Sequence, residues 1–148
     1  MISEQTEFQY VLEKSREFVA QPLALTEQLM SDVATSAPEI LRSRLEQILS
    51  RKGKRIRAIL LLLIANSKDE VAKDNLYKQA SMAAGIELLH LASLVHDDVI
   101  DKSSMRRGGK TPNQRWGNKI AVLLGDYLLA KSMELSFDSG ISQITHIL

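Results

Sequence analysis

Apolar residues recur at intervals of three or four positions along most of this chain, which is the spacing of an amphipathic α-helix. The first such stripe ends near Pro22, and a second runs from Leu25 to Val33. The segment Ser36–Glu39 has the pattern of a capping box, which would begin a third helix. No segment alternates polar and apolar residues long enough to predict a strand. The sequence therefore predicts an all-α protein.

The second half of the chain predicts three longer helices, over residues 54–66, 74–101 and 118–137. A polar loop that contains glycine and proline separates the last two, over residues 102–113. Residues 141–148 begin one more apolar face. We find no internal repeat, so the whole chain is expected to form part of one helical domain.

The helix expected over residues 74–101 is apolar on nearly all sides from Met82 to Ile100, which indicates a central, buried position. Polar side chains in such a helix cost free energy unless they have partners. We interpret His96 as a packing or hydrogen-bonding residue, because it faces away from Asp97. His90 lies on the Asp97 side and is the better functional candidate.

Composition narrows the possible functions. The 148 residues are 45% hydrophobic, enough for one modest domain, and their formal net charge of +1 provides no overall field for nucleic acid. With no cysteine, the chain has neither disulfides nor thiolate metal sites. The N-terminus lacks the apolar core of a signal peptide, and the most apolar run, 56–65, is too short to span a bilayer. We expect a soluble, cytoplasmic protein without a transmembrane segment.

Three aspartates, Asp97, Asp98 and Asp101, end the central helix. On a helix, Asp97 and Asp101 differ by about 40° in direction and lie about 6 Å apart, whereas Asp98 is turned about 100° away. Two carboxylates this close repel each other at a helix end that already disfavours anions. A solvated acidic helix end is one interpretation. The other is a hard cation, best Mg²⁺, which binds one or two carboxylates together with water and phosphate oxygens.

A basic cluster surrounds Gly53 at the expected start of the helix over residues 54–66. Its five cations lie within seven residues: Arg51, Lys52, Lys54, Arg55 and Arg57. A helix N-terminus attracts anions, and Lys54 and Arg57 would share one face while Arg55 points elsewhere. A solvated basic turn or a nucleic-acid patch would look similar. Nucleic acid is disfavoured because no aromatic residues alternate with the cations.

Arg106 and Arg107 form a second basic pair, in a glycine-containing loop that follows the aspartates. Arginine pairs are suited to binding phosphate through two parallel hydrogen bonds. One carboxylate pair of the magnesium type and two basic clusters together favour two polyanionic substrates. Two diphosphates, one bound through metal and one held by cations, fit this description.

Four segments resemble, in order and spacing, the trans-type polyprenyl diphosphate synthases. They are GKRIR at 53–57, ELLHLASLVHDDVID at 87–101, MRRGGKTPN at 105–113 and WGNKIAVLLGDYLLA at 116–130. The resemblance covers about residues 40–137. It implies an all-α helical bundle of the isoprenoid synthase type and a magnesium-dependent, usually homodimeric prenyltransferase. Such enzymes join an allylic diphosphate to isopentenyl diphosphate.

By position, the resemblance implies a role for each candidate residue. Asp97 and Asp101, supported by Asp98, would bind Mg²⁺ that bridges to the allylic diphosphate, and Arg106 would hold that same diphosphate. Isopentenyl diphosphate would be held by four residues: Lys54, Arg57, His90 and Arg107. The allylic C–O bond ionises, the isopentenyl double bond attacks the carbocation, and loss of a proton completes the longer chain.

Product length in this family is set by residues below the first aspartate on the same helix. Ala92 and Ser93 are both small, which is similar to medium- and long-chain synthases. Ile86 lies about 16 Å lower on the Asp97 side and could act as a deeper floor.

The chain departs from the family pattern in its length. Family members are about twice as long and carry a second aspartate-rich motif, whereas the acids after Asp101 are scattered: Asp126, Glu134 and Asp138. Three interpretations follow: the N-terminal half of a synthase, a half-length subunit that needs a partner chain, and a non-catalytic diphosphate-binding or structural remnant. A terpene cyclase is a weaker alternative. We expect the chain alone to be weakly active or inactive, and to self-associate. Its expected protein partner is a second copy in a homodimer or a C-terminal half.

Overall fold

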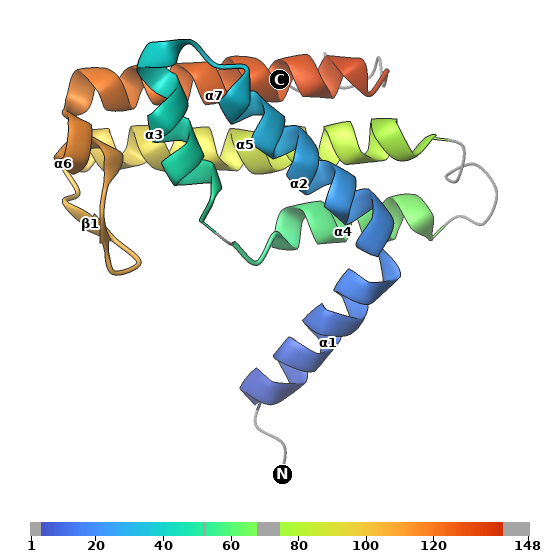
Figure 1. Cartoon of the computed structure of the whole chain (residues 1–148). Helices are drawn as coiled ribbons and strands as arrows, with labels where there is room; N and C mark the ends of the chain where they lie inside the picture. The colour runs from blue at the N-terminus through green and yellow to red at the C-terminus, as the bar shows by residue number, and fades with distance from the viewer. Residues whose placement is uncertain (1–3, 52, 68–74, 141–148) are drawn as a thin grey trace.

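The helices follow the apolar stripes of the sequence closely. The computed structural model describes residues 4–51, 53–67 and 75–140 (Figure 1). Its helices are α1 Glu4–Phe18, α2 Ala20–Thr35, α3 Glu39–Leu49, α4 Ile56–Asn66, α5 Leu76–Ile100, α6 Pro112–Trp116 and α7 Asn118–Asp138. The predicted all-α class is confirmed. The helical face expected over residues 141–148 lies outside the described residues.

Helix α5 occupies the centre of the assembly, as its apolar sequence predicts. It packs against α7, α2 and α4, and Figure 1 shows it between α7 and α4 while α2 crosses them. Leu88 of α5, Leu45 of α3 and Leu124 of α7 are fully buried in the main core cluster. A second cluster joins Ile59 and Leu62 of α4 to Ala83. Removal of these side chains from water provides the main driving force for the fold.

Glycines allow α5 and α7 to approach each other closely. A Cβ atom on Gly85 would lie 2.6 Å from the Ser136 hydroxyl and 3.0 Å from the Ser132 carbonyl oxygen. A Cβ on Gly125 would lie 2.1 Å from Nε2 of His96. The same Nε2 atom lies 3.3 Å from the Val122 carbonyl oxygen, so the packing and hydrogen-bonding role expected for His96 is confirmed.

The capping box expected at Ser36 is wrong. Ser36 is instead the C-cap of α2, where its N–H bonds to the carbonyl of Asp32. Helix α3 begins after Pro38, which has an extended backbone and makes no side-chain cap. Its carbonyl accepts bonds from the N–H groups of Leu41 and Arg42. The fixed φ of proline sets the start of this helix in place of a serine hydroxyl.

The polar loop expected over residues 102–113 contains a short hairpin and the start of α6. Strands β1 Met105–Arg106 and β2 Gly109–Lys110 pair antiparallel. The turn between them, Arg107 and Gly108, has positive φ at both positions, as tight hairpin turns require. With two residues in each strand, no alternating pattern could reveal the hairpin. None of the described helices has both the length and the apolar character to cross a membrane.

Candidate active site

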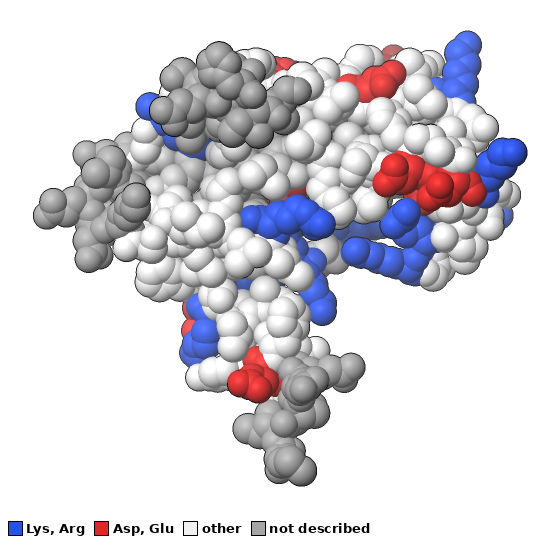
Figure 2. Space-filling model, turned by 180° about the vertical axis from the view of Figure 1, so that it is seen from behind, with Lys and Arg blue, Asp and Glu red and all other residues white. Residues whose placement is uncertain are grey.

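A cavity of about 860 Å³ lies where α5, the segment before α4, the hairpin and α6 meet. Eight basic side chains line it: Arg51, Lys54, Arg55, Arg57, Arg106, Arg107, Lys110 and Arg115. Glu87 and Asp98 are the carboxylates in its lining. Figure 2 shows Lys and Arg side chains gathered near the middle of one face, beside a group of acidic side chains. The two basic clusters that the sequence predicts therefore belong to one site.

The segment before α4 differs from its prediction. Helix α4 begins at Ile56, so Lys54 precedes the helix and does not share a helical face with Arg57. Nη2 of Arg16 in α1 donates to the Lys54 carbonyl at 2.8 Å, and Nζ of Lys54 lies 5.2 Å from the centre of the Phe8 ring. These contacts fix the segment against α1 in an arrangement that local helical spacing could not predict.

Glu87 partners the start of α4 from the central helix. Its side chain is buried, with 8% of its surface exposed, and its Oε1 accepts a 3.1 Å hydrogen bond from the N–H of Ala58. The first N–H groups of a helix lack partners within the helix and favour negative charge. Glu87 therefore holds the turn that carries Arg57 against α5. The sequence marks Glu87 as polar in an apolar helix, but it does not reveal the partner.

His90, one turn after Glu87 and half-buried, lines the same cavity. Burial lowers the pKa of His90 below its ordinary value, and the nearby charge of Arg57 lowers the pKa further, while Glu87 opposes this shift. Arg107 and Arg106 add smaller effects in the lowering direction. A neutral imidazole surrounded by cations is suited to taking up a proton when an anion binds.

Arg55 also lines the cavity, so the expectation that it points elsewhere is wrong. It is the N-cap of α4 and adopts a left-handed backbone with φ of 51°. This conformation turns the chain between Lys54 and Ile56 and breaks the helical spacing on which the expectation relied.

Asp98 and Arg106 form the best-defined ion pair of the site. Asp98 is 2% exposed, and its two oxygens accept bonds from Nε of Arg106 at 2.9 and 3.1 Å, while Nη2 of Arg106 lies 2.9 Å from Oδ1. This contact raises the pKa of Arg106. The Asp98 carbonyl accepts a further bond from Nδ2 of Asn113 at 3.1 Å. Asp98 thus joins the end of α5 to strand β1 of the hairpin and to α6.

Asp97 and Asp101 are exposed, and among the described residues no basic side chain pairs with either. Helix α5 ends at Ile100, and Asp101 is its C-cap. The N–H groups of Lys102 and Ser103 then bond back to the carbonyls of Val99 and Asp98, as in a Schellman motif. Asp101 therefore lies one residue beyond the helix that was expected to contain it.

The fit of these residues to Mg²⁺ depends on how many ligands they provide. Within residues 4–51, 53–67 and 75–140, no group of three or more His, Asp or Glu side chains could hold a metal ion. Two exposed carboxylates, Asp97 and Asp101, are what Mg²⁺ usually takes from a protein when water and phosphate oxygens complete its shell. The residues fit this ion.

The three residues expected to set product length differ in their exposure along α5. Ser93 is exposed, as is Asp97 one turn later, and its hydroxyl donates to the His90 carbonyl at 2.8 Å. Ile86 is half-buried. Ala92 is 2% exposed and belongs to the main core cluster. Of the two small residues, Ser93 is therefore the one on the open side.

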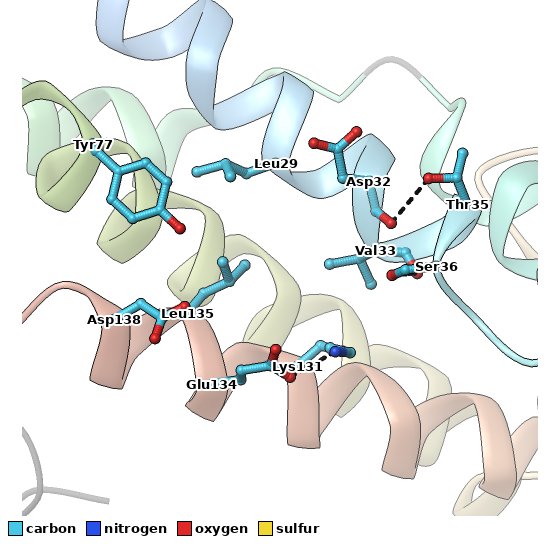
Figure 3. Close-up of a pocket in the computed structure, with 10 residues that line it drawn as sticks. All are labelled: Leu29, Asp32, Val33, Thr35, Ser36, Tyr77, Lys131, Glu134, Leu135 and Asp138. Atoms are coloured by element: carbon cyan, nitrogen blue, oxygen red, sulfur yellow. Dashed lines mark hydrogen bonds and ion pairs between the residues drawn. The ribbon is translucent and has the colours of Figure 1, made fainter.

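A second hollow of about 350 Å³ lies between α2, the start of α5 and the end of α7 (Figure 3). Tyr77, Asp32 and Asp138 line it, together with Lys131 and Glu134, which form an ion pair at 2.6 Å. None of the predicted site residues lines this hollow. Of the acids that follow Asp101, Glu134 is thus paired with Lys131, and Asp138 lines this hollow and not the basic cavity.

Comparison with known proteins decides the family. A family model described as polyprenyl synthetase matches residues 38–148. The chain belongs to the polyprenyl synthetase family. It is 41% identical over 120 residues to an all-trans-nonaprenyl-diphosphate synthase of Rhodobacter capsulatus, covering 81% of this chain and 36% of the relative. It is 34% identical over 142 residues to the octaprenyl diphosphate synthase of Escherichia coli, covering 93% of this chain and 41% of that protein.

Solved structures of polyprenyl synthetases have the same fold. A decaprenyl diphosphate synthase from Rhodobacter capsulatus matches with a TM-score of 0.77 and 31% identity, over 92% of this chain and 41% of that one. A polyprenyl synthase from Caulobacter crescentus, complexed with calcium and isoprenyl diphosphate, matches with a TM-score of 0.80 and 28% identity, over 92% and 40%. The predicted family and helical bundle of the isoprenoid synthase type are confirmed. The chain spans about two fifths or less of the length of these relatives.

Sequence reasoning missed several residues of this polyprenyl synthetase site. Asn113 holds the loop by donating to the carbonyls of Asp98 and Ser103, and Thr111 donates its hydroxyl to Ser103 at 2.7 Å. Arg115 reaches the cavity from α6. Asn113 and Thr111 lie in the RRGGKTPN segment and could have been suspected from it. Nothing in the sequence around Arg115 indicates its place.

Proposed function

We propose that this chain provides part of the active site of a magnesium-dependent prenyltransferase. The reaction would condense isopentenyl diphosphate with an allylic diphosphate to give a medium- or long-chain polyprenyl diphosphate. One observation carries the proposal: basic residues from the segment before α4, the hairpin and α6 line one cavity beside the α5 end that bears Asp97 and Asp101. This arrangement suits two diphosphates better than a single anion.

Each substrate has a set of residues in this proposal. Lys54, Arg57, His90 and Arg107 would hold the diphosphate of isopentenyl diphosphate. Arg106, fixed by Asp98, would hold the allylic diphosphate beside Asp97 and Asp101, the carboxylates that would bind Mg²⁺. Bound Mg²⁺ would supply electrostatic stabilisation of the departing diphosphate.

The chain's own residues would act by binding and orientation. When the allylic C–O bond breaks, the electron pair leaves with diphosphate, and Arg106 would stabilise the negative charge that develops there. The isopentenyl double bond then forms the new C–C bond to the allylic carbon, and loss of one proton restores a double bond. The cations around isopentenyl diphosphate would align its double bond with that carbon.

The chain's partial coverage of its relatives favours a second candidate function. The chain spans 36% and 41% of the nonaprenyl and octaprenyl synthases to which it is similar. The alternative is a half-length subunit, or a non-catalytic diphosphate-binding or structural remnant, that needs a partner chain. We also propose that the chain is cytoplasmic and does not bind nucleic acid. Its protein partner would be a second copy in a homodimer or a C-terminal half.

Incorporation of radiolabelled isopentenyl diphosphate into product tests the proposal. The chain would be assayed with farnesyl diphosphate and Mg²⁺, alone and with the C-terminal part of the Rhodobacter capsulatus relative. We expect little product from the chain alone and clear product from the mixture. The double variant Asp97→Ala/Asp101→Ala should abolish that product, and Lys119→Ala, an exposed residue outside the cavity, should not alter it.

The outcomes separate the alternatives. Robust product from the pure chain would overturn the expected need for further residues. If the mixture makes no product but calorimetry detects isopentenyl diphosphate binding that Arg57→Gln weakens, the diphosphate-binding alternative holds. Absence of both product and binding would reject the proposed function altogether.

A further inference from the structure

Helix α1 contacts the candidate active site from outside the part of the chain that identifies the family. The match to the family model begins at residue 38, whereas α1 ends at Phe18. None of the described α1 residues lines the basic cavity, but two of them contact the segment before α4, which does. Figure 1 shows α1 projecting from the body of the molecule, which it joins near the start of α2. Helix α1 therefore reaches the site through the segment before α4.

Arg16 of α1 holds the backbone of this segment. Its Nη2 atom donates to the carbonyl oxygen of Lys54 at 2.8 Å and to that of Gly53 at 3.4 Å. Among the described residues no carboxylate forms an ion pair with Arg16. One guanidinium nitrogen thus binds two successive carbonyl groups, and both carbonyls are directed to the α1 side of the segment.

The direction of these carbonyls determines the direction of the neighbouring N–H groups. The described chain has no cis peptide bond, and in a planar trans peptide the C=O and N–H groups point in opposite directions. The N–H groups of Lys54 and Arg55 belong to the peptide units whose carbonyls Arg16 binds, so they point away from Arg16. Gly53, Lys54 and Arg55 line the cavity, whereas Arg16 does not. The two N–H groups are therefore directed to the cavity side, and neither has a backbone acceptor in the described part of the chain.

The backbone at Arg55 needs such support. Its φ of 51° is unfavourable for a residue with a side chain, and a conformation of this kind persists only where its surroundings enforce it. Arg16 holds the peptide unit that precedes Arg55, and Glu87 holds the N–H of Ala58 in the first turn after it. The segment is thus fixed by α1 before the left-handed residue and by α5 after it.

Phe8 provides a second contact from α1. The Nζ atom of Lys54 lies 5.2 Å from the centre of the Phe8 ring, within the range of a cation–π interaction. This contact restricts the side chain of Lys54, whereas Arg16 restricts its backbone. An ammonium group has three N–H donors, so a ring on one side leaves others free for phosphate oxygens. Both contacts reduce the conformational freedom that Lys54 would lose when an anion binds, which favours binding.

We propose that Arg16 is a positioning residue for the isopentenyl diphosphate site. It directs the N–H groups of Lys54 and Arg55 toward the bound diphosphate, and Phe8 supports it by holding the Lys54 side chain. Successive N–H groups on one side of a chain form a concave binding place for anionic oxygens. Arg16 itself does not touch the substrate. The inference rests on the proposed function, which assigns isopentenyl diphosphate to this segment.

Calorimetric titration of the chain with isopentenyl diphosphate and with inorganic diphosphate tests this role. Arg16→Met keeps the length of the side chain but has no donor, so affinity for both ligands should fall about fivefold or more. Arg16→Lys retains a donor and should recover affinity to within about twofold of the unchanged chain. Lys14→Met is the matched control, because Lys14 is an exposed cation of α1 that pairs with Glu17, and its affinities should stay within about twofold.

Binding of farnesyl diphosphate with Mg²⁺ separates positioning from a loss of structure. The proposed function assigns an allylic diphosphate to Asp97, Asp101 and Arg106, so Arg16→Met should leave this affinity within about twofold and the thermal melt unchanged. Equal losses for both substrates, or a lowered melting temperature that Arg16→Lys does not restore, would show a structural role and reject positioning. An unchanged affinity for isopentenyl diphosphate in Arg16→Met, or an equal loss in Lys14→Met, would also reject it.

The titrations also distinguish this inference from the proposed function. If the unchanged chain binds inorganic diphosphate but not isopentenyl diphosphate, the proposed function fails, while a loss of inorganic diphosphate affinity in Arg16→Met would still support the positioning role. If the unchanged chain and Arg16→Met bind isopentenyl diphosphate equally well, only the inference fails. A chain that binds neither ligand has no anion site to position, and this result would reject both.

Discussion

The three neighbouring aspartates at the end of α5 have different environments. Asp98 is enclosed and paired with Arg106, whereas Asp97 and Asp101 are exposed and have no basic partner among the described residues. A carboxylate that already accepts bonds from a guanidinium is a poor candidate for a metal ligand. We therefore interpret Asp98 as the residue that positions Arg106, and Asp97 and Asp101 as the carboxylates available to Mg²⁺.

Replacing Asp98 should destabilise the chain. Asp98→Asn removes the charge from an ion pair whose carboxylate is buried, and about 1 to 3 kcal/mol of unfolding free energy should be lost. The exposed part of Arg106 can be solvated, which keeps the loss moderate. Urea denaturation measures it, and Asp101→Asn serves as the control, with an expected change within about 0.5 kcal/mol. Equal effects of the two variants would contradict the assignment.

Binding of isopentenyl diphosphate should depend on pH through His90. Burial and Arg57 lower the pKa of His90, Arg106 and Arg107 act in the same direction, and Glu87 opposes them. A bound diphosphate would raise this pKa. At pH values between the pKa of His90 in the free chain and its pKa in the complex, binding is therefore accompanied by uptake of a proton. Affinity should therefore increase as the pH falls from about 8 to about 6. Calorimetry in buffers of different ionisation enthalpy measures the proton uptake, and His90→Gln corrects for titration of the ligand. Identical uptake in both proteins would exclude His90 as its source.

Product length should depend on the size of the side chains on the exposed side of α5. In a competent enzyme that contains this chain, Ser93→Phe should shorten the products, because its bulk projects from the exposed side one turn below Asp97. Ile86→Ala should lengthen them by removing a floor about 16 Å lower. Ala92→Val serves as the comparison for these two variants. Because Ala92 is buried in the core, its enlargement should lower the stability of the chain and leave the product lengths unchanged. Chromatography of the products measures the effect, and unchanged distributions in the first two variants would reject this geometry.

At the scale of elements, the close contact of α5 with α7 sets the direction of the central helix and hence of its aspartates. Gly85→Ala should destabilise the chain by about 1 to 3 kcal/mol, because the added Cβ meets the Ser132 carbonyl oxygen at 3.0 Å as well as the Ser136 hydroxyl. Thermal unfolding measures the loss. Ser136→Ala in the same chain should restore part of it by removing one of the two clashes. A more stable Gly85→Ala variant would show that helix propensity outweighs the contact.

The start of α4 shows how two elements determine a third. The basic cluster and the apolar run after it predict a helix that includes Lys54, but α4 begins only at Ile56. Arg16 of α1 holds the Lys54 carbonyl, and Glu87 of α5 holds the N–H of Ala58. These bonds come from residues more than 25 positions away in the sequence, so no local pattern could predict where the helix begins.

At the scale of the whole molecule, apolar side chains remain exposed on several helices. Ile64 of α4 is 71% exposed and Ile100 of α5 is 75% exposed, and Phe137 of α7 and Phe18 of α1 are more than half exposed. The exposed apolar side chains of α5 and α7 are thus only part of this surface, since α4 and α1 contribute as well. Large exposed apolar surface favours association.

We predict that the chain self-associates at micromolar concentration. Leu60 and Ile64 lie one turn apart on the exposed side of α4, and the double variant Leu60→Lys/Ile64→Lys should weaken association at least severalfold. Light scattering and sedimentation measure the assembly. Glu39→Lys, an exposed polar position on α3, provides a control for added positive charge. A compact, well-folded monomer of the unchanged chain would contradict the prediction.

Much of the fold follows from local pattern, whereas the site follows only in outline. The apolar stripes place α5 and α7 within two residues of their ends among the described residues, because long periodic helices bury one continuous face. The hairpin is too short to leave a pattern. The roles of Asp98, Glu87 and Arg55 depend on partners from other elements, and spacing along one helix carries no information about them.

The sequence by itself determined the helical class and the family, and it predicted the two basic clusters, because side-chain spacing and charge are properties of the linear chain. Only the tertiary structure decided which aspartate pairs with Arg106, where α4 begins, and that Arg51 and Arg55 face the same cavity as Arg57. These outcomes depend on contacts between distant segments. Packing and desolvation, which act only after the helices meet, select them.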